Sequence, residues 1–407
     1  MIRKTDIEAV VSRQLKDLDA QESYDREALA GVVDVKENFA TIITGIRRCG
    51  KSTLVSQMMR QFSSKSLYLN FDTPRLFGFT IDDFVILDMV ISDNNPEYLF
   101  FDEIQIVEGW ELYVRGKLDE GYKVVVTGSN ASLLGRELGT KLTGRHLEKT
   151  LFPFSFSEYV GFRGLDLSSE SFNSYLNEGG FPAYLRTYDE SVLENMYTDI
   201  LYRDIMVRYN LRDEHAVKNL ALFLMANVGN IVSATKLTQT IKVKTSKTVL
   251  EYFDYMENAY LFSFVRKFSY SFKSQVLNPR KVYAIDTGLQ RVVSPSASAD
   301  SGRRLENAVF LQLRRMGKDV YYYNDKGYEC DFVVCEHGAP VSLIQVCEVL
   351  NYENEAREVN GLVEAMNALN VADGMILTKE QTDVIMVNGR AINVVPVWKW
   401  NGRIANQ

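Results

Sequence analysis

The segment that most constrains the fold is Gly45-Ile-Arg-Arg-Cys-Gly-Lys-Ser52. It matches the pattern G-x-x-x-x-G-K-[ST] at every fixed position. An apolar run ends just before it at Thr44, and an amphipathic run begins near Ser52. The glycines let the backbone curl so that its N–H groups face phosphate oxygens, and a helix N-terminus adds positive potential there. The segment therefore predicts a strand, a phosphate-binding loop (P-loop) and a helix, in that order.

The same segment predicts the ligands ATP and Mg²⁺. We expect the charge of Lys51 to lie at the β- and γ-phosphates and the hydroxyl of Ser52 to ligate Mg²⁺. Arg47 and Arg48 lie inside the loop, and the sequence leaves open whether they contact nucleotide, DNA or only solvent. The residues predicted to bind the nucleotide here are Gly45, Ile46, Arg47, Arg48, Cys49, Gly50, Lys51, Ser52 and Thr53.

A second motif lies about 50 residues beyond the P-loop lysine, where the apolar run 98–101 ends in two acids, Asp102 and Glu103. A carboxylate at the end of a buried strand can hold the water shell of Mg²⁺, which is the metal-binding role predicted for Asp102 beside Ser52. Glu103 is placed to polarise the attacking water. With Lys51, these two acids predict ATP hydrolysis.

Other polar residues are candidates for sensing or stabilising the phosphates. Ser129 and Asn130 follow a further apolar run, 123–127, and either sense the γ-phosphate or form a plain Ser/Asn turn. Arg136 and Arg145 are candidates for stabilising transition-state charge, and a surface salt bridge is the alternative for each. We count Arg145 among the predicted catalytic residues and Asn130 among those that bind the nucleotide.

The pattern around these motifs predicts an α/β fold with a parallel sheet covered on both faces, because apolar strands alternate with helices. An earlier helical pattern, carried by Ile7, Val10, Val11, Leu15 and Leu18, is expected to pack onto this domain. The predicted strands are residues 39–44, 66–71, 98–101 and 123–127, and the predicted helices are residues 52–62 and 109–118.

Beyond Pro153 the pattern becomes mostly helical, up to about residue 277. Two short helices, 233–241 and 246–256, are joined by a tight turn, and strands 260–265 and 282–285 could follow them as the wing of a winged helix. A helix at 305–316 leads into strands 319–323, 329–334 and 341–346 and a final αβ segment. We therefore predict three domains, at residues 1–160, 161–290 and 291–407.

The helix–turn–helix region is basic in an acidic chain. Residues 233–281 carry nine basic and three acidic side chains, a net charge of +6 where the whole chain has −7. Helix–turn–helix geometry would place Thr245 to Thr248 near a DNA groove. The alternative is a protein-binding module whose lysines are merely solvated. The lysines predicted near phosphates are Lys242, Lys244 and Lys247.

Composition excludes several other classes of protein. The four cysteines show no CxxC spacing and the three histidines are scattered, so neither a zinc site nor a disulfide framework is expected. The apolar stretch 220–232 is too short to span a bilayer, and the N-terminus shows no secretory signal. We expect a cytoplasmic protein without a membrane segment.

These motifs resemble a family of prokaryotic AAA-type ATPases, of the ASCE class of P-loop proteins, in which a C-terminal domain of unknown function follows the P-loop domain. The resemblance covers nearly the whole chain. It implies an ATPase core, a helical winged-helix region and a restriction-endonuclease-like α/β domain. The matching segments are residues 45–53, 102–105, 109–110, 127–130, 142–145, 152–156, 179–182, 202–204, 286–289, 305–307, 329–332 and 345–347.

The nuclease-like part departs from the pattern of an active enzyme. Restriction-type nucleases combine a helix glutamate, a strand aspartate and an acid-x-lysine on the next strand. Glu306 and Asp331 occupy the first two places, but Gln345 and Cys347 stand where the acid and the lysine would be. Cysteine supplies no positive charge at pH 7, so we expect that catalysis is lost and that Cys347 is a small buried side chain.

Three functions remain open at this stage. The first is an ATPase whose nucleotide-driven switch is coupled to DNA through the winged helix. The second is a nucleotide-gated protein-interaction module with slow hydrolysis and no DNA role, and the third is an active metal-dependent nuclease. AAA-type relatives often assemble into rings, so a homo-oligomer is also implied by the resemblance.

Overall fold

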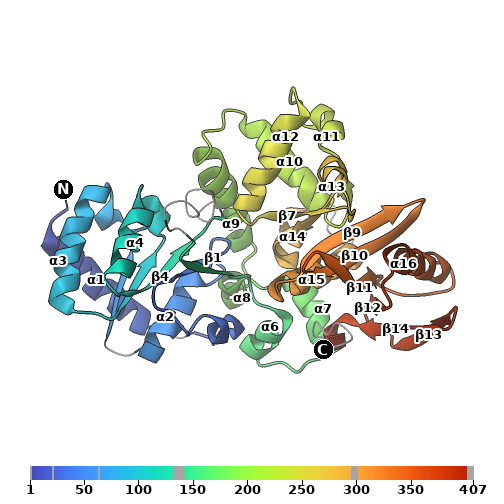
Figure 1. Cartoon of the computed structure of the whole chain (residues 1–407), viewed down its shortest axis with the longest axis horizontal. Helices are drawn as coiled ribbons and strands as arrows, with labels where there is room; N and C mark the ends of the chain where they lie inside the picture. The colour runs from blue at the N-terminus through green and yellow to red at the C-terminus, as the bar shows by residue number, and fades with distance from the viewer. Residues whose placement is uncertain are drawn as a thin grey trace. The chain divides into compact units, whose positions relative to one another are not determined.

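The structure, a computed structural model, describes residues 2–20, 23–62, 65–131, 142, 144–294 and 301–400 (Figure 1). Arg136 lies outside the described residues. The chain separates into two compact units, residues 1–152 and 153–407. The boundary that we predicted near residue 290 falls inside the second unit, and the division into three domains stays a prediction.

The first unit is built on a parallel sheet in the order β2-β3-β4-β1-β5, which confirms the predicted α/β core. The four apolar runs form β1 to β4, each within a residue or so of its predicted bounds. The fifth strand was not predicted, because it is a half-exposed edge strand whose polar residues form no apolar run. The strands are β1 (Ala40–Thr44), β2 (Ser66–Asn70), β3 (Tyr98–Asp102), β4 (Lys123–Gly128) and β5 (His146–Thr150).

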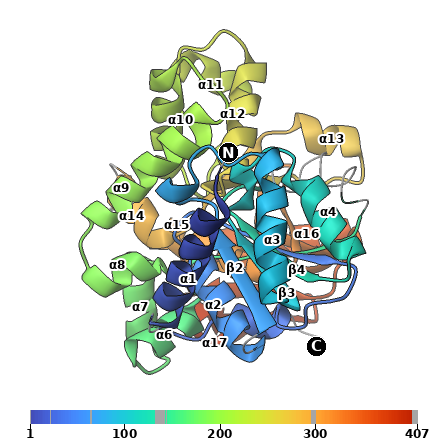
Figure 2. The same cartoon turned by 90° about the vertical axis from the view of Figure 1, so that its left-hand side faces the viewer.

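Helices pack on this sheet and share its core. Ile7 and Val10 of α1 are buried in the same apolar cluster as the strands, as predicted. Figure 2 shows α1 and α3 side by side over β2. The α3 helix was not predicted, because its apolar residues surround the helix instead of following one face. The helices are α1 (Lys4–Asp19), α2 (Lys51–Phe62), α3 (Phe84–Asn94) and α4 (Trp110–Asp119), with a 3₁₀ turn, η1 (Glu27–Gly31).

The second unit begins with helices, as predicted. They are α6 (Phe156–Arg163), α7 (Ser169–Glu178), α8 (Pro182–Thr187), α9 (Ser191–Asp199), a π-helical segment (Ile200–Val207) and α10 (Glu214–Ala226). The two predicted short helices follow as α11 (Ala234–Thr240) and α12 (Ser246–Asn258). Thr245 caps α12, where its hydroxyl accepts a hydrogen bond from the backbone N–H of Thr248 at 3.2 Å.

A three-stranded antiparallel sheet in the order β6-β8-β7 adjoins these helices. Its strands are β6 (Ile231–Val232), β7 (Phe262–Arg266) and β8 (Arg280–Ala284), with α13 (Phe272–Leu277) between the last two and α14 (Thr287–Val293) after them. The expected strand pair is therefore present, while its interpretation as the wing of a winged helix stays a prediction.

The end of the chain forms a six-stranded mixed sheet in the order β13-β14-β12-β11-β10-β9. Helix α16 packs on β10 and β11, where Leu362 and Val333 belong to one buried apolar cluster. The elements are α15 (Ser301–Arg315), β9 (Asp319–Asp325), β10 (Tyr328–Glu336), β11 (Ala339–Val346), α16 (Glu355–Leu369), β12 (Gly374–Thr378), β13 (Asp383–Val387), β14 (Arg390–Pro396) and α17 (Val397–Trp400).

None of the helices in the described ranges is long and apolar enough to cross a membrane.

Candidate functional site

The P-loop joins the end of β1 to the start of α2, and its two glycines are required by its shape. Gly45 has φ 146° and Gly50 has φ 103°, conformations that L side chains rarely adopt. A Cβ added at Gly45 would lie 2.2 Å from the carbonyl oxygen of Leu151, on the segment that follows β5. Backbone therefore crosses directly over the loop and fixes its position.

Arg26 braces the same loop and was not predicted from the sequence. The residue is only 5% exposed, and its guanidinium donates to the carbonyl of Cys49 at 2.7 Å and to that of Phe152 at 2.8 Å. A Cβ at Gly50 would lie 2.9 Å from its Nη1 atom. No local pattern marks this arginine, because its role depends on a contact with residues far along the chain.

Lys51 is buried and lies folded against the loop. Its ammonium donates to the carbonyls of Gly45 at 3.1 Å and Ile46 at 3.3 Å, and it lies 3.5 Å from the Glu103 carboxylate. Burial by itself would lower the pKa of Lys51, but the charges of Glu103 and Asp102 outweigh it and raise the pKa above its ordinary value. The side chain therefore carries a positive charge in a desolvated position, which suits an anionic ligand.

Asp102 ends β3 in full burial, and every described contact of its carboxylate is with a donor. The Oδ2 atom accepts from the Ser52 hydroxyl at 2.6 Å, from Tyr68 at 2.7 Å and from Asn70 at 3.1 Å, while Oδ1 accepts from Thr127. Burial and the charge of Glu103 raise the pKa of Asp102. Mg²⁺ prefers hard oxygen ligands. The adjacent oxygens of Ser52 and Asp102, anchored by β2 and β4, therefore fit a nucleotide-bound Mg²⁺.

Glu103 follows with a left-handed backbone, φ 53°, which is unusual for a residue other than glycine. This conformation turns its carboxylate toward Lys51, and the amide of Gln105 donates to it. Burial alone would raise the pKa of Glu103, but the Lys51 ammonium and the Gln105 amide lower it below the ordinary value. Backbone strain at this acid agrees with a functional position.

The remaining predicted nucleotide residues lie at the same edge of the sheet. Ser129 and Asn130 follow β4 directly and are buried, and β4 pairs with both β1 and β3. Arg47 is half-buried at 3.9 Å from Asp72, and Arg48 is exposed. Burial raises the pKa of the Cys49 thiol, so it is a packed side chain and no nucleophile.

Arg145 is the predicted catalytic residue that the structure does not bring to this site. Its carbonyl accepts from the N–H of Ala40, at the start of β1, whereas the P-loop begins at the other end of that strand. The four residue steps of β1 separate the two ends by about 13 Å. The guanidinium forms an ion pair with Asp119 at 2.8 Å. The structure therefore does not place Arg145 beside the P-loop of its own chain, and its catalytic role stays a prediction that would require a neighbouring subunit's site.

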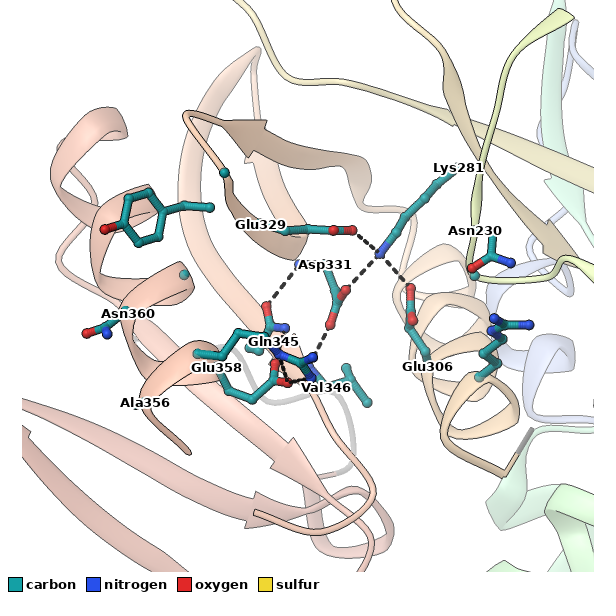
Figure 3. Close-up of a pocket in the computed structure, with 16 residues that line it drawn as sticks. Asn230, Lys281, Glu306, Glu329, Asp331, Gln345, Val346, Ala356, Glu358 and Asn360 are labelled. Carbon is teal, nitrogen blue, oxygen red and sulfur yellow. Dashed lines mark hydrogen bonds and ion pairs between the residues drawn. The ribbon is translucent and has the colours of Figure 1, made fainter. Parts of the chain in front are cut away.

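The nuclease-like residues gather around a cavity of about 520 Å³ inside the second unit (Figure 3). Glu306 comes from α15, Asp331 from β10 and Gln345 from β11, and all three line it. Cys347 is buried as predicted, and burial raises the pKa of its thiol to about 12. The sequence did not reveal that Lys281 of β8 also lines this cavity.

Comparison with known proteins gives family matches for two segments of the chain. Residues 37–160 match a family described as an AAA domain, and residues 169–299 match a domain of unknown function. A solved structure, the Hsp104–ADP complex of S. cerevisiae, is similar over 61% of this chain and 40% of its own, at 12% identity and a TM-score of 0.33.

Two whole-chain relatives are much more similar. An uncharacterized protein of Methanocaldococcus jannaschii is 33% identical over 395 residues, which cover 89% of this chain and 88% of that protein. An uncharacterized protein of Haemophilus influenzae is 33% identical over 320 residues, covering 73% of this chain and 79% of its own length. The chain therefore belongs to the same family as these two proteins, and its residues 37–160 form an AAA domain.

Proposed function

We propose that this chain binds ATP with Mg²⁺ at the P-loop and hydrolyses it. The observation that carries the proposal is the convergence of four polar side chains at one edge of the parallel sheet. There Ser52 donates to Asp102 at 2.6 Å and Lys51 lies 3.5 Å from Glu103. A buried cation, a hydroxyl beside a carboxylate and a second acid are the groups that phosphoryl transfer to water requires.

In this proposal the P-loop amides and Lys51 bind the phosphates. The Lys51 ammonium exchanges the carbonyls of Gly45 and Ile46 for phosphate oxygens, which are stronger, charged acceptors. Ser52, and Asp102 through water, would hold a bound Mg²⁺, which would neutralise charge at the phosphates. The hydrogen bonds that Tyr68 and Thr127 donate keep the Asp102 carboxylate aimed at that position.

Glu103 is the proposed general base. Its lowered pKa keeps the carboxylate ionised, and a phosphate that draws Lys51 away would release it to accept a proton from water. Asn130, at the end of β4, is proposed to contact the γ-phosphate from the neighbouring strand. The remaining loop residues, Ile46, Arg47, Arg48, Cys49 and Thr53, bind through their backbone or line the phosphates.

We further propose that ATP turnover is coupled to DNA through α11 and α12. Lys242, Lys244 and Lys247 are exposed around the start of α12, where a recognition helix contacts DNA. Two of the nine basic residues do not support this interpretation, because Lys281 is buried and Arg280 is 3.9 Å from Asp254. The basic surface is therefore narrower than the sequence count indicated.

A protein partner is the alternative, and a separate observation favours it. Tyr270, Phe272 and Leu277, at α13 between β7 and β8, are 77%, 71% and 72% exposed. Large apolar side chains clustered on one exposed segment are typical of protein-interaction surfaces. In this alternative the nucleotide state controls binding of a protein, hydrolysis is slow and DNA has no role.

The test is the steady-state ATPase rate of the purified chain with and without duplex and single-stranded DNA. We expect Glu103→Gln to lower the rate about 100-fold or more, which is the usual contribution of a positioned base. Lys51→Ala should also lower the rate strongly, because it removes the cation at the phosphates. Glu108→Gln is the matched control, because Glu108 is an exposed acid on the same connection between β3 and α4.

Equal rates in wild type and Lys51→Ala would overturn the ATPase proposal. A rate that DNA stimulates, and that Glu103→Gln abolishes, would support coupling to DNA. An ATPase rate indifferent to DNA would instead favour the protein partner.

A further inference from the structure

The nuclease-like cavity contains a cation that its sequence motif does not supply. Lys281 of β8 enters from the three-stranded sheet, as Figure 3 shows, and its side chain is almost fully buried. Its Nζ atom lies 2.7 Å from Asp331, 3.0 Å from Glu306 and 3.2 Å from Glu329. The ammonium therefore sits at the meeting point of three carboxylates.

The three acids hold the ammonium of Lys281. An ammonium group has three N–H donors and no acceptor. Two of them donate to Glu306 and Asp331, and the ammonium also pairs with Glu329 at 3.2 Å. The group is therefore held by three acids instead of being directed at an attacking water or a phosphate oxygen, which a catalytic lysine would have to contact. Lys281 thus does not take over the role of the lysine that Cys347 replaces.

The remaining ligand positions are also taken by the protein itself. The second oxygen of Asp331 accepts from the N–H of Val346 at 2.9 Å. The Gln345 amide accepts from the N–H of Asp331 at 3.2 Å and donates to Glu358 at 2.6 Å. In the described part of the chain, no group of three or more His, Cys, Asp or Glu side chains is arranged to hold a metal ion. With the Lys281 ammonium in place, the divalent cation of a nuclease centre does not fit these residues.

We propose that the Lys281 ammonium is the resident cation of this centre, in the position that a divalent metal ion would take between Glu306 and Asp331. It makes the centre independent of metal and inactive toward phosphodiesters. Because Lys281 belongs to β8 and its partners to α15 and β10, it also ties the strand that follows the helix–turn–helix to the terminal sheet.

The charges around the cavity agree with this role. Buried carboxylates are costly unless a cation or hydrogen bonds compensate them. Tyr283, also on β8, donates to the Glu306 oxygen that contacts Lys281, at 2.6 Å. Burial and the charge of Asp331 raise the pKa of Glu306 to about 7, so this acid takes up a proton near neutrality. The Lys281 ammonium then compensates part of the charge of the three acids.

The experiment is calorimetric titration of the nucleotide-free full chain with Mn²⁺, with plasmid cleavage measured in parallel. We expect wild type and Asp331→Asn to bind Mn²⁺ equally poorly and to leave the plasmid intact. Lys281→Met removes the ammonium, so it should gain one Mn²⁺ site per chain, with affinity roughly tenfold or more above wild type. The double variant Lys281→Met/Asp331→Asn should lose that site again.

Mn²⁺ binding or plasmid cleavage by wild type that Asp331→Asn abolishes would overturn the proposal, and that comparison does not depend on the folding of any Lys281 variant. A folded Lys281→Met chain that gains no Mn²⁺ site would overturn it as well. Lys281→Arg keeps the positive charge and should, like wild type, bind no Mn²⁺. Because no arm measures ATP hydrolysis, these outcomes are independent of the ATPase test.

Discussion

Two buried cations, Arg26 and Lys281, complete the two centres of this chain from outside their sequence motifs. Arg26 precedes β1 and donates to the P-loop carbonyl of Cys49 and to that of Phe152 beyond β5. Lys281 lies on β8 and holds three carboxylates of α15 and β10. Each uses charge-assisted hydrogen bonds in a desolvated position, where such bonds are strong and their loss is costly. At the scale of single residues, both sites therefore depend on partners that no local spacing reveals.

Replacement of Arg26 should weaken both stability and nucleotide binding. Arg26→Met leaves the carbonyls of Cys49 and Phe152 without this donor, which we expect to cost about 1–3 kcal/mol in the stability of the first unit. ATP affinity should fall as well, because the loop loses its brace. Chemical denaturation and titration with a fluorescent ATP analogue measure the two effects.

The matched control is Arg13→Met on α1, where the arginine side chain is 68% exposed in an ion pair with Asp17. That change should stay within about 0.5 kcal/mol of wild type and leave ATP affinity unchanged. Equal behaviour of the Arg26 and Arg13 variants would show that the P-loop holds its shape without the guanidinium.

At the scale of elements, the sequence predicted those strands and helices whose own apolar residues show that they are buried. The runs that form β1 to β4 are continuous and apolar because helices cover both faces of the parallel sheet. The strand β5 escaped prediction because only one neighbour pairs with it and its residues, such as Glu148 and Lys149, are polar. Lys281 was counted among the basic residues that could contact DNA. The alternation of side chains along β8 does not show which face of the strand packs against α15, so the sequence did not reveal that Lys281 is buried.

The lysines at the start of α12 test whether this helix contacts DNA. Lys244→Glu/Lys247→Glu should lower DNA affinity at least tenfold and reduce the slope of log affinity against log salt by about 2, because each lysine would neutralise one phosphate. Lys247 lies 3.8 Å from Glu251 but is 85% exposed, so its charge remains accessible. Fluorescence anisotropy with labelled duplex DNA at several salt concentrations provides both numbers.

The control is a charge reversal of equal size on exposed lysines of the first unit, Lys16→Glu/Lys36→Glu. If both double variants bind DNA alike, or if the salt slope does not change, α12 is not the DNA-binding element. The exposed apolar residues of α13 would then be the next surface to alter.

At the scale of the whole molecule, the open question is whether one chain or an assembly forms the complete ATP site. The chain itself supplies the P-loop, Ser52, Asp102 and Glu103 at one edge of the sheet. Arg145 lies at the opposite edge of the sheet, where it forms an ion pair with Asp119. This ion pair explains its position without a catalytic role. An arginine there can act on a phosphate only in the site of another copy.

We expect Arg145→Ala to hydrolyse ATP at the wild-type rate and to lose no more than about 1 kcal/mol of stability, as for other exposed ion pairs. The decisive measurement mixes Arg145→Ala with Lys51→Ala. If Arg145 acted in a neighbour's site, each variant alone would be inactive, and the mixture would recover activity, since a Lys51 from one chain would meet an Arg145 from the other. Recovery on mixing would therefore show a shared site and an obligate assembly, whereas an active Arg145→Ala chain places all of the essential groups within a single subunit.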